Sequence, residues 1–210
     1  MPETAPSRQA QKERTREAIL AAALGLSHDH GFAQLSLRQV TRAAGVVPTA
    51  FYRHFDSMDE VGLALVEQSF GTLRRMIRDA QQDPEIVDNI IDASADVLVA
   101  AVKQNRAHFA FVSRERLGGS AAVRAAIQHE LELFISELAM FLARIPQLGR
   151  WSTEDVKMIS GMFVRNMVYR AEQVVETPEG RIDLEEEVKR KARREMRMIV
   201  LGFEEWKSDA

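Results

Sequence analysis

The stretch "LSLRQVTRAAGVVPTAFYRHF", residues 35–55, carries the signals for two short helices joined by a tight turn. Ser36 and Gln39 have the spacing of a capping box, which begins a helix. Gly45 can take the left-handed conformation that ends this helix near Ala44. Pro48 suits the first turn of the next helix, because its missing N–H costs nothing there. We expect this second helix to run from Pro48 to about Phe55.

Two short helices joined through a glycine turn match a helix-turn-helix, in which the second helix lies in the major groove of DNA. Thr49, Tyr52 and Arg53 stand at i, i+3 and i+4 and therefore share one face of that helix. Phe51 and Phe55 are expected to pack inward. Exposed tyrosine and arginine side chains suit contacts with phosphates and base edges. The spacing therefore predicts a segment held outside the core for docking on duplex DNA.

Charge is distributed unevenly along the 210 residues, whose total is −3. Residues 1–55 hold seven basic and four acidic side chains, a net +3, so the remainder carries −6. This asymmetry is typical of a head that binds a polyanion on a body that does not.

The motifs "AAGV" and "FYRHF" within this stretch resemble the DNA-binding domain of TetR-type transcriptional repressors. The resemblance implies that Tyr52 and His54 contact phosphates. This family often has a lysine where the chain has Met58, so one of three basic residues of the first helix, Arg14, Arg16 or Lys12, is expected to compensate. The predicted DNA-binding residues are Lys12, Arg38, Gln39, Pro48, Thr49, Tyr52, Arg53 and His54.

The rest of the chain shows helical spacing of apolar residues, interrupted by glycine and proline, and no sustained strand alternation. We therefore expect an all-α fold of about nine helices. They are expected over about 8–28, 36–44, 48–55, 57–82, 86–102, 108–116, 123–145, 152–174 and 183–206, with Asp183 capping the last. Asp83–Pro84 is the expected boundary. The predicted organisation is a DNA-binding domain (1–56), a connecting helix (57–82) and a ligand-binding and dimerisation domain (83–210).

The body is rich in phenylalanine and methionine, which suit an irregular apolar cavity but also an ordinary core. Asn166 and Arg170 interrupt an apolar stripe, where they could hold a ligand head group, face solvent or meet a second subunit. The stretch "SRERLGGSAAVRAA", residues 113–126, is a basic turn leading into a helix, a candidate anion cradle. Its two glycines could equally just break helices. The predicted ligand-binding residues are Phe111, Arg114, Arg116, Phe134, Leu138, Phe163, Asn166 and Arg170.

The pattern "RER-G-SAA-RAA", taken with the head motif and "ISELA", resembles a narrower group. These are the bacterial repressors of unsaturated fatty-acid synthesis and of fatty-acid desaturase operons. The resemblance implies a long-chain acyl-CoA effector whose saturation sets operator affinity, and a homodimer, formed by the last two helices, that reads an inverted repeat of double-stranded DNA. Two alternatives stay open: a TetR-type repressor of an efflux or other operon that senses another hydrophobe, and a helical lipid carrier without a DNA role.

Catalytic chemistry finds little support in the sequence. The absence of cysteine excludes thiolate zinc sites and thiol catalysis, and His28 and His30 are spaced wrongly for a metal pair on a helix. We therefore expect no enzyme activity, no metal and no cofactor. The N-terminus lacks the apolar segment of a secretory signal, and no apolar run reaches the roughly 18 residues of a membrane span. A cytoplasmic protein without membrane contact is expected.

Overall fold

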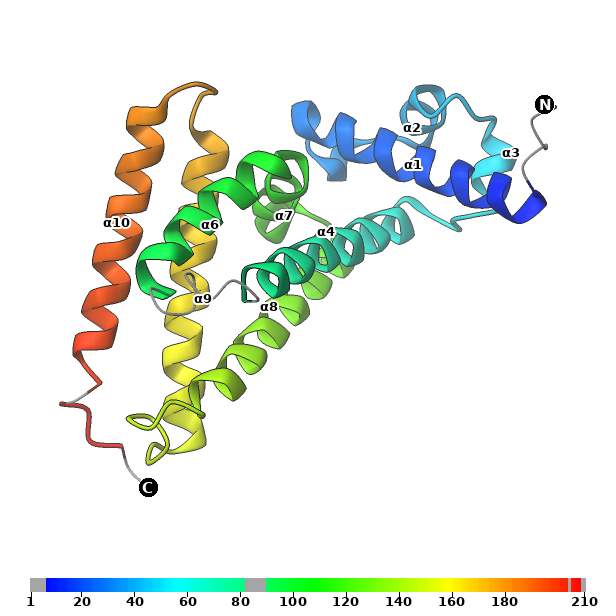
Figure 1. Cartoon of the computed structure of the whole chain (residues 1–210). Helices are drawn as coiled ribbons and strands as arrows, with labels where there is room; N and C mark the ends of the chain where they lie inside the picture. Colours follow the sequence, from blue (N-terminus) through cyan, green and yellow to red (C-terminus); the bar gives the residue numbers. More distant parts are fainter. Residues whose placement is uncertain (1–6, 82–89, 204, 209–210) are drawn as a thin grey trace, which may run out of the picture. The chain divides into compact units, whose positions relative to one another are not determined.

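The computed structural model describes residues 7–81, 90–203 and 205–208. In this part of the chain it contains nine α-helices, one short 3₁₀ helix and no strand, which confirms the all-α prediction (Figure 1). The elements are α1 (Arg8–His30), η1 (Phe32–Gln34), α2 (Leu37–Ala43), α3 (Pro48–Phe51), α4 (Met58–Gln81), α6 (Ile90–Gln104), α7 (Arg106–Gly118), α8 (Ala121–Leu142), α9 (Thr153–Glu176) and α10 (Ile182–Leu201).

The chain forms two compact units. The head unit consists of Met1–Ser69 and Ala110–Ile127, and the body unit of Phe70–Phe109 and Gln128–Ala210. Helices α4, α7 and α8 therefore each contribute residues to both units. The expected boundary at Asp83–Pro84 lies outside the described residues, and the functional division at residues 56 and 82 stays a prediction.

The head unit is built on a core that includes Ile19 of α1, Val40 of α2 and Phe51 of α3, all completely buried. Phe32 of η1 meets Phe111 of α7 edge to face, with ring centroids 5.7 Å apart. Gly62 of α4 is also packed tightly here, because a Cβ at this position would lie 2.7 Å from a methyl group of Val123 and 2.8 Å from the ring of Phe32. Residues 110–127 thus complete the core of the head.

The body unit is organised around α6, α9 and α10, which pack on one another (Figure 1). One buried cluster joins residues of these helices with α7, including Val102, Val174 and Val188. Acidic side chains of α6 face basic side chains of α10: Asp96 pairs with Lys189 at 3.0 Å and with Arg193 at 2.6 Å. Ion pairs and apolar packing therefore hold α6 and α10 together.

Arginines near the two ends of α7 satisfy carbonyl groups at the ends of other helices. In the body unit, Arg106 donates to the backbone oxygens of Val175 and Thr177 at the end of α9. In the head unit, Arg114 donates to the backbone oxygens of Ser27 and His28 in the last turns of α1. The last carbonyls of a helix have no partner within it, so each arginine acts as a C-terminal cap.

The last helix begins and ends differently from the prediction. Ser152 caps α9 as expected, its hydroxyl accepting from the N–H of Asp155 at 3.1 Å. Asp183, however, does not cap α10: the N-cap is Arg181, and Asp183 lies in the first turn. Its carboxylate pairs with Arg181 at 2.6 Å, and this hydrogen bond lowers the pKa of Asp183 to about 2. The helix ends at Leu201, so Trp206 follows it instead of closing its stripe.

Candidate nucleic-acid interface

The local signals that begin and end α2 are used as predicted. The hydroxyl of Ser36 accepts from the N–H of Gln39, and the side-chain oxygen of Gln39 accepts from the N–H of Ser36 at 2.9 Å. Gly45 has φ +67°, the left-handed conformation that a side chain disfavours. The capping box and this glycine together set the turn between α2 and α3.

Helix α3 is shorter than predicted. It covers only Pro48–Phe51, and the chain then continues through turns to Phe55. The N–H groups of Arg53 and His54 donate to carbonyls three residues back, at 3.2 and 2.8 Å, in place of the four-residue spacing of an α-helix. The recognition segment, residues 48–55, is therefore one α-helical turn followed by tighter turns.

The recognition segment divides into a buried side and an exposed side. Phe51 and Phe55 are 0% and 2% exposed, and their rings lie 5.8 Å apart. Tyr52 is 60% exposed, although its ring also packs edge to face on Phe51 at 5.6 Å. Thr49 and Arg53 are exposed as well. The phenylalanines thus anchor a short segment whose polar face is free of the head unit's own packing.

The other predicted DNA-binding residues lie on α1, on α2 and at the start of α3 in the same unit. Lys12, Arg38, Gln39 and Pro48 are all exposed. Gln39 has its side-chain oxygen committed to the capping box, which leaves its amide nitrogen for other contacts. Met58, which stands where the resemblance leads one to expect lysine, is half-buried at the start of α4.

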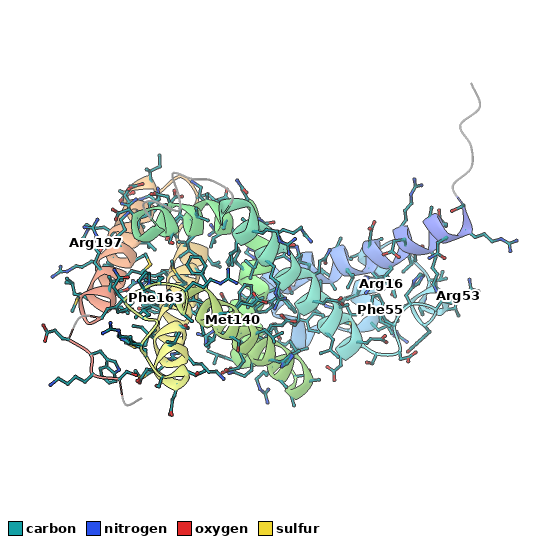
Figure 2. The ribbon with its side chains drawn as sticks, turned by 60° about the horizontal axis from the view of Figure 1, so that its bottom comes forward. Arg16, Arg53, Phe55, Met140, Phe163 and Arg197 are labelled. Carbon is teal, nitrogen blue, oxygen red and sulfur yellow. The ribbon has the colours of Figure 1, made fainter. Side chains whose placement is uncertain are left out.

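Positive charges converge on His54. Arg16 of α1 lies over the ring of Phe55, with its guanidinium carbon 5.4 Å from the centroid, and Arg53 extends from the same end of the head (Figure 2). Burial lowers the pKa of His54, the charges of Lys12, Arg16 and Arg53 lower it further, and Glu13 opposes them. The Nδ1 atom of His54 is buried without a hydrogen-bond partner. An anion bound here would offset this repulsion.

Three predicted ligand residues belong to the head unit: Phe111, Arg114 and Arg116. Phe111 is buried against Phe32, and Arg114 caps α1, so both have structural roles. Between the two arginines lies Glu115, which sequence reasoning missed. Glu115 is 2% exposed, and one carboxylate oxygen accepts from the N–H of Phe32 at 2.8 Å. Its position four residues after Phe111, on the same helical face, was the available signal.

The other five predicted ligand residues belong to the body unit. Phe134 packs on Phe70 with centroids 5.7 Å apart, and Leu138 and Phe163 border one buried cluster. Asn166 and Arg170 both donate to Glu195 of α10, at 2.6 and 3.0 Å.

These contacts tie α9 to α10 and give the polar interruption of the α9 stripe a structural partner. The ligand role of all eight residues stays a prediction.

The described residues also bear on metal binding and membrane insertion. No group of three or more histidine, aspartate or glutamate side chains is arranged to hold a metal ion there. In the same residues, every helix is too short or too polar to cross a membrane.

Residues 19–65 match the family model for bacterial regulatory proteins of the tetR family. The match includes the end of α1, all of α2 and α3, and the start of α4. This part of the head is therefore similar to a TetR-type DNA-binding domain, as the resemblance implied.

Solved structures of low sequence identity share the fold over nearly the whole chain. The fatty acid degradation regulator FadR from Bacillus halodurans is 15% identical, with 92% of this chain and 95% of that chain covered and a TM-score of 0.68. AibR, solved with isovaleryl coenzyme A and operator DNA, is 15% identical, with 85% and 96% covered and a TM-score of 0.64. A TetR-family regulator from Streptomyces coelicolor is 16% identical, with 91% and 96% covered and a TM-score of 0.68.

Proposed function

We propose that this chain, a regulator of the TetR family, is a repressor of unsaturated fatty-acid or desaturase genes whose operator affinity depends on bound long-chain acyl-CoA. The observation that carries the DNA-binding part is the exposed side of the recognition segment. Tyr52 and Arg53 lie outward on a turn that buried Phe51 and Phe55 hold in place. A rigid, exposed, basic segment on a helix-turn-helix is suited to the major groove.

The eight predicted residues divide by the kind of DNA contact we expect. Tyr52, His54 and Lys12 contact phosphates, which position the protein without reading sequence. The side chains expected to reach base edges or neighbouring phosphates are Arg38, Gln39, Thr49 and Arg53. Pro48 starts the segment and brings the first turn of α3 against the duplex.

A homodimer with twofold symmetry suits this function, because an inverted repeat presents the same half-site twice. The exposed sides of α9 and α10 carry apolar residues that a second copy would cover: Met162 is 45% exposed, Tyr169 52% and Met198 67%. Exposed apolar side chains gathered on neighbouring helices are typical of an interface. We assign dimerisation to this pair of helices.

The acyl-CoA effector is supported by what two structural relatives are described as binding or regulating. One is a regulator of fatty acid degradation and another was solved with an acyl-CoA. A 100-fold change in operator affinity requires about 2.7 kcal/mol of difference between the two ligand states. A few methylenes that a kinked chain fails to bury, at about 0.8 kcal/mol each, are sufficient.

The DNA-binding proposal is tested with an operator duplex selected from a randomised library by the purified protein. Arg53→Ala should weaken binding by about 1–3 kcal/mol, roughly 5- to 150-fold, and relax sequence preference. Tyr52→Ala should weaken binding to all duplexes alike. Arg150→Ala, at an exposed arginine of the body unit, is the matched control and should bind as the wild type does. Equal affinity of all four proteins would contradict the assignment.

The effector proposal needs a separate measurement. Mass spectrometry under native conditions should detect acyl thioesters retained on the purified protein. Titration with a saturated and a cis-unsaturated acyl-CoA of equal length should then give different operator affinities. Identical affinities, or retention of only aromatic cations, would exclude the acyl-CoA mechanism and favour a sensor of another hydrophobe.

A further inference from the structure

The N-terminal half of α1 is a stretch of helix that the head unit does not need for its core. Residues 8–18 contain no buried side chain, and the first buried residue of α1 is Ile19. Between positions 8 and 17 the only apolar side chain is Ala10. A helix that is polar on all sides gains little stability from tertiary packing, so burial does not explain why these turns are helical.

This half-helix is nevertheless well specified at its start. Ser7 is the N-cap, and its hydroxyl accepts from the N–H of Ala10 at 3.2 Å. A cap of this kind stabilises a helix by about 1 kcal/mol. The first turns are therefore helical, and their side chains project at the regular spacing of an α-helix.

Three basic residues form a row along one side of these turns. Arg8, Lys12 and Arg16 are spaced at four residues, so they lie one above the other on a helix. Arg14, two residues after Lys12, points to another side.

The C-terminal end of the row lies beside the recognition segment. Arg16 lies over the ring of Phe55. Lys12 and Arg16 are also close enough to His54 to act on its charge, together with Arg53 from the turn itself. The row thus continues into the residues that approach DNA.

We infer that Arg8, Lys12 and Arg16 form a second contact surface for the sugar–phosphate backbone, beside the helix-turn-helix. This inference rests on the proposed DNA-binding function and extends its footprint. The row is about 12 Å long, since eight residues rise 1.5 Å each. One strand carries a charge about every 3.4 Å of duplex axis, so the row is long enough to follow more than one phosphate.

Charge complementarity selects DNA backbone as the occupant. Residues 8–17 hold four basic and two acidic side chains, and Glu13 and Glu17 each lie one position past Lys12 and Arg16, off the line of the row. The buried Nδ1 of His54 has no hydrogen-bond partner and lies at the inner end of this positive surface. A phosphate there would lower the mutual repulsion of these groups.

The test compares the salt dependence of DNA binding between the two sides of one helix. A fluorescent operator duplex, selected from a random library, is titrated with wild type, the double variant Arg8→Ala/Lys12→Ala, and Arg14→Ala as the matched control. Titrations between about 50 and 200 mM salt give the slope of log affinity against log salt concentration. The double variant should have a shallower slope, by about 0.9 for every phosphate contact removed, while Arg14→Ala keeps the wild-type slope.

Three results would overturn the inference. Equal slopes for the double variant and the wild type would show that the row touches no phosphate. An equal loss in Arg14→Ala would show a general effect of charge instead of a row. If the wild type itself bound duplex DNA without salt dependence, the proposed function would fail as well. Thermal unfolding of each variant, expected to be unchanged at these exposed positions, excludes loss of fold.

Discussion

The buried carboxylate of Glu115 offers a sharp test of how α7 supports the head. One of its oxygens accepts from the N–H of Phe32 at 2.8 Å, and its side chain is 2% exposed. Glu115→Leu fills the same space with an apolar side chain of similar size, but it leaves the N–H of Phe32 buried without an acceptor. A buried donor left in this way costs about 1–3 kcal/mol.

Glu115→Gln separates the hydrogen bond from the charge. Glutamine keeps a carbonyl oxygen for the N–H of Phe32 and removes a negative charge whose second oxygen has no hydrogen-bond partner in the structure. Its cost should therefore stay below about 1 kcal/mol, or the variant should be more stable than the wild type.

Urea denaturation followed by far-ultraviolet circular dichroism, at one fixed protein concentration, measures both variants. For a chain of this size 1 kcal/mol shifts the thermal midpoint by about 2–4 °C, which gives an independent readout. Glu67→Leu, at an exposed glutamate of α4, is the control and should stay within about 0.5 kcal/mol of wild type. If Leu at position 115 costs no more than this control, or if Gln costs as much as Leu, the hydrogen bond from Phe32 to Glu115 does not stabilise the head.

Four further predictions follow from other sites. The pKa of His54 lies below its ordinary value of 6.5, so the unfolded chain binds this proton more readily than the folded chain does. The free energy of unfolding that His54 contributes should therefore fall as the pH drops below 6.5. DNA phosphate should favour the imidazolium form, so operator affinity should rise as pH falls in anisotropy titrations, and His54→Gln should flatten this dependence. Gly62→Ala should lower the thermal midpoint, because overpacking costs about 1–3 kcal/mol and the gain in helix propensity is only about 1 kcal/mol. An unchanged midpoint would show that the side chains of Val123 and Phe32 move to make room for the methyl group. Ser36→Ala should destabilise the protein by about 0.5–2 kcal/mol in urea denaturation through loss of the α2 cap, whereas Ser36→Thr should cost less. Glu195→Ala should cost about 1–2 kcal/mol in the same assay, because the 5%-exposed Arg170 loses its carboxylate partner while Gln173 still accepts from it and solvent screens the 37%-exposed Glu195; a loss below about 0.5 kcal/mol would mean that solvent replaces the carboxylate.

Local chemistry accounts for what could be predicted from the sequence. Ser36, Gln39 and Gly45 act through contacts within a few residues, so their pattern predicted the start and end of α2 correctly. The alternation of buried Phe51 and Phe55 with exposed Tyr52 followed from helical spacing. The length of α3 did not, because the tighter turn after Phe51 depends on hydrogen bonds that no residue type dictates.

Contacts between segments far apart in sequence were beyond such reasoning. The partners of Arg114 lie 86 and 87 residues away on α1. Asn166 and Arg170 find Glu195 on a different helix. The sequence identified these side chains as unusual polar groups but carried no information on what they would meet. Helix capping and hydrogen bonds between helices use the same polar groups as ligand binding. A structural role and a ligand-binding role therefore leave the same pattern in the sequence.

The head of this protein cannot be transplanted as one continuous piece of chain. A fragment that stops at Ser69 leaves out the Phe111 ring that covers Phe32, the Glu115 acceptor and the Val123 methyl group against Gly62. A hybrid that joins the proposed DNA-binding head to a foreign body must therefore bring residues 110–127 along with 1–69. Exchange of parts between such proteins is accordingly easier by altering a few surface side chains of the recognition segment than by cutting and rejoining modules.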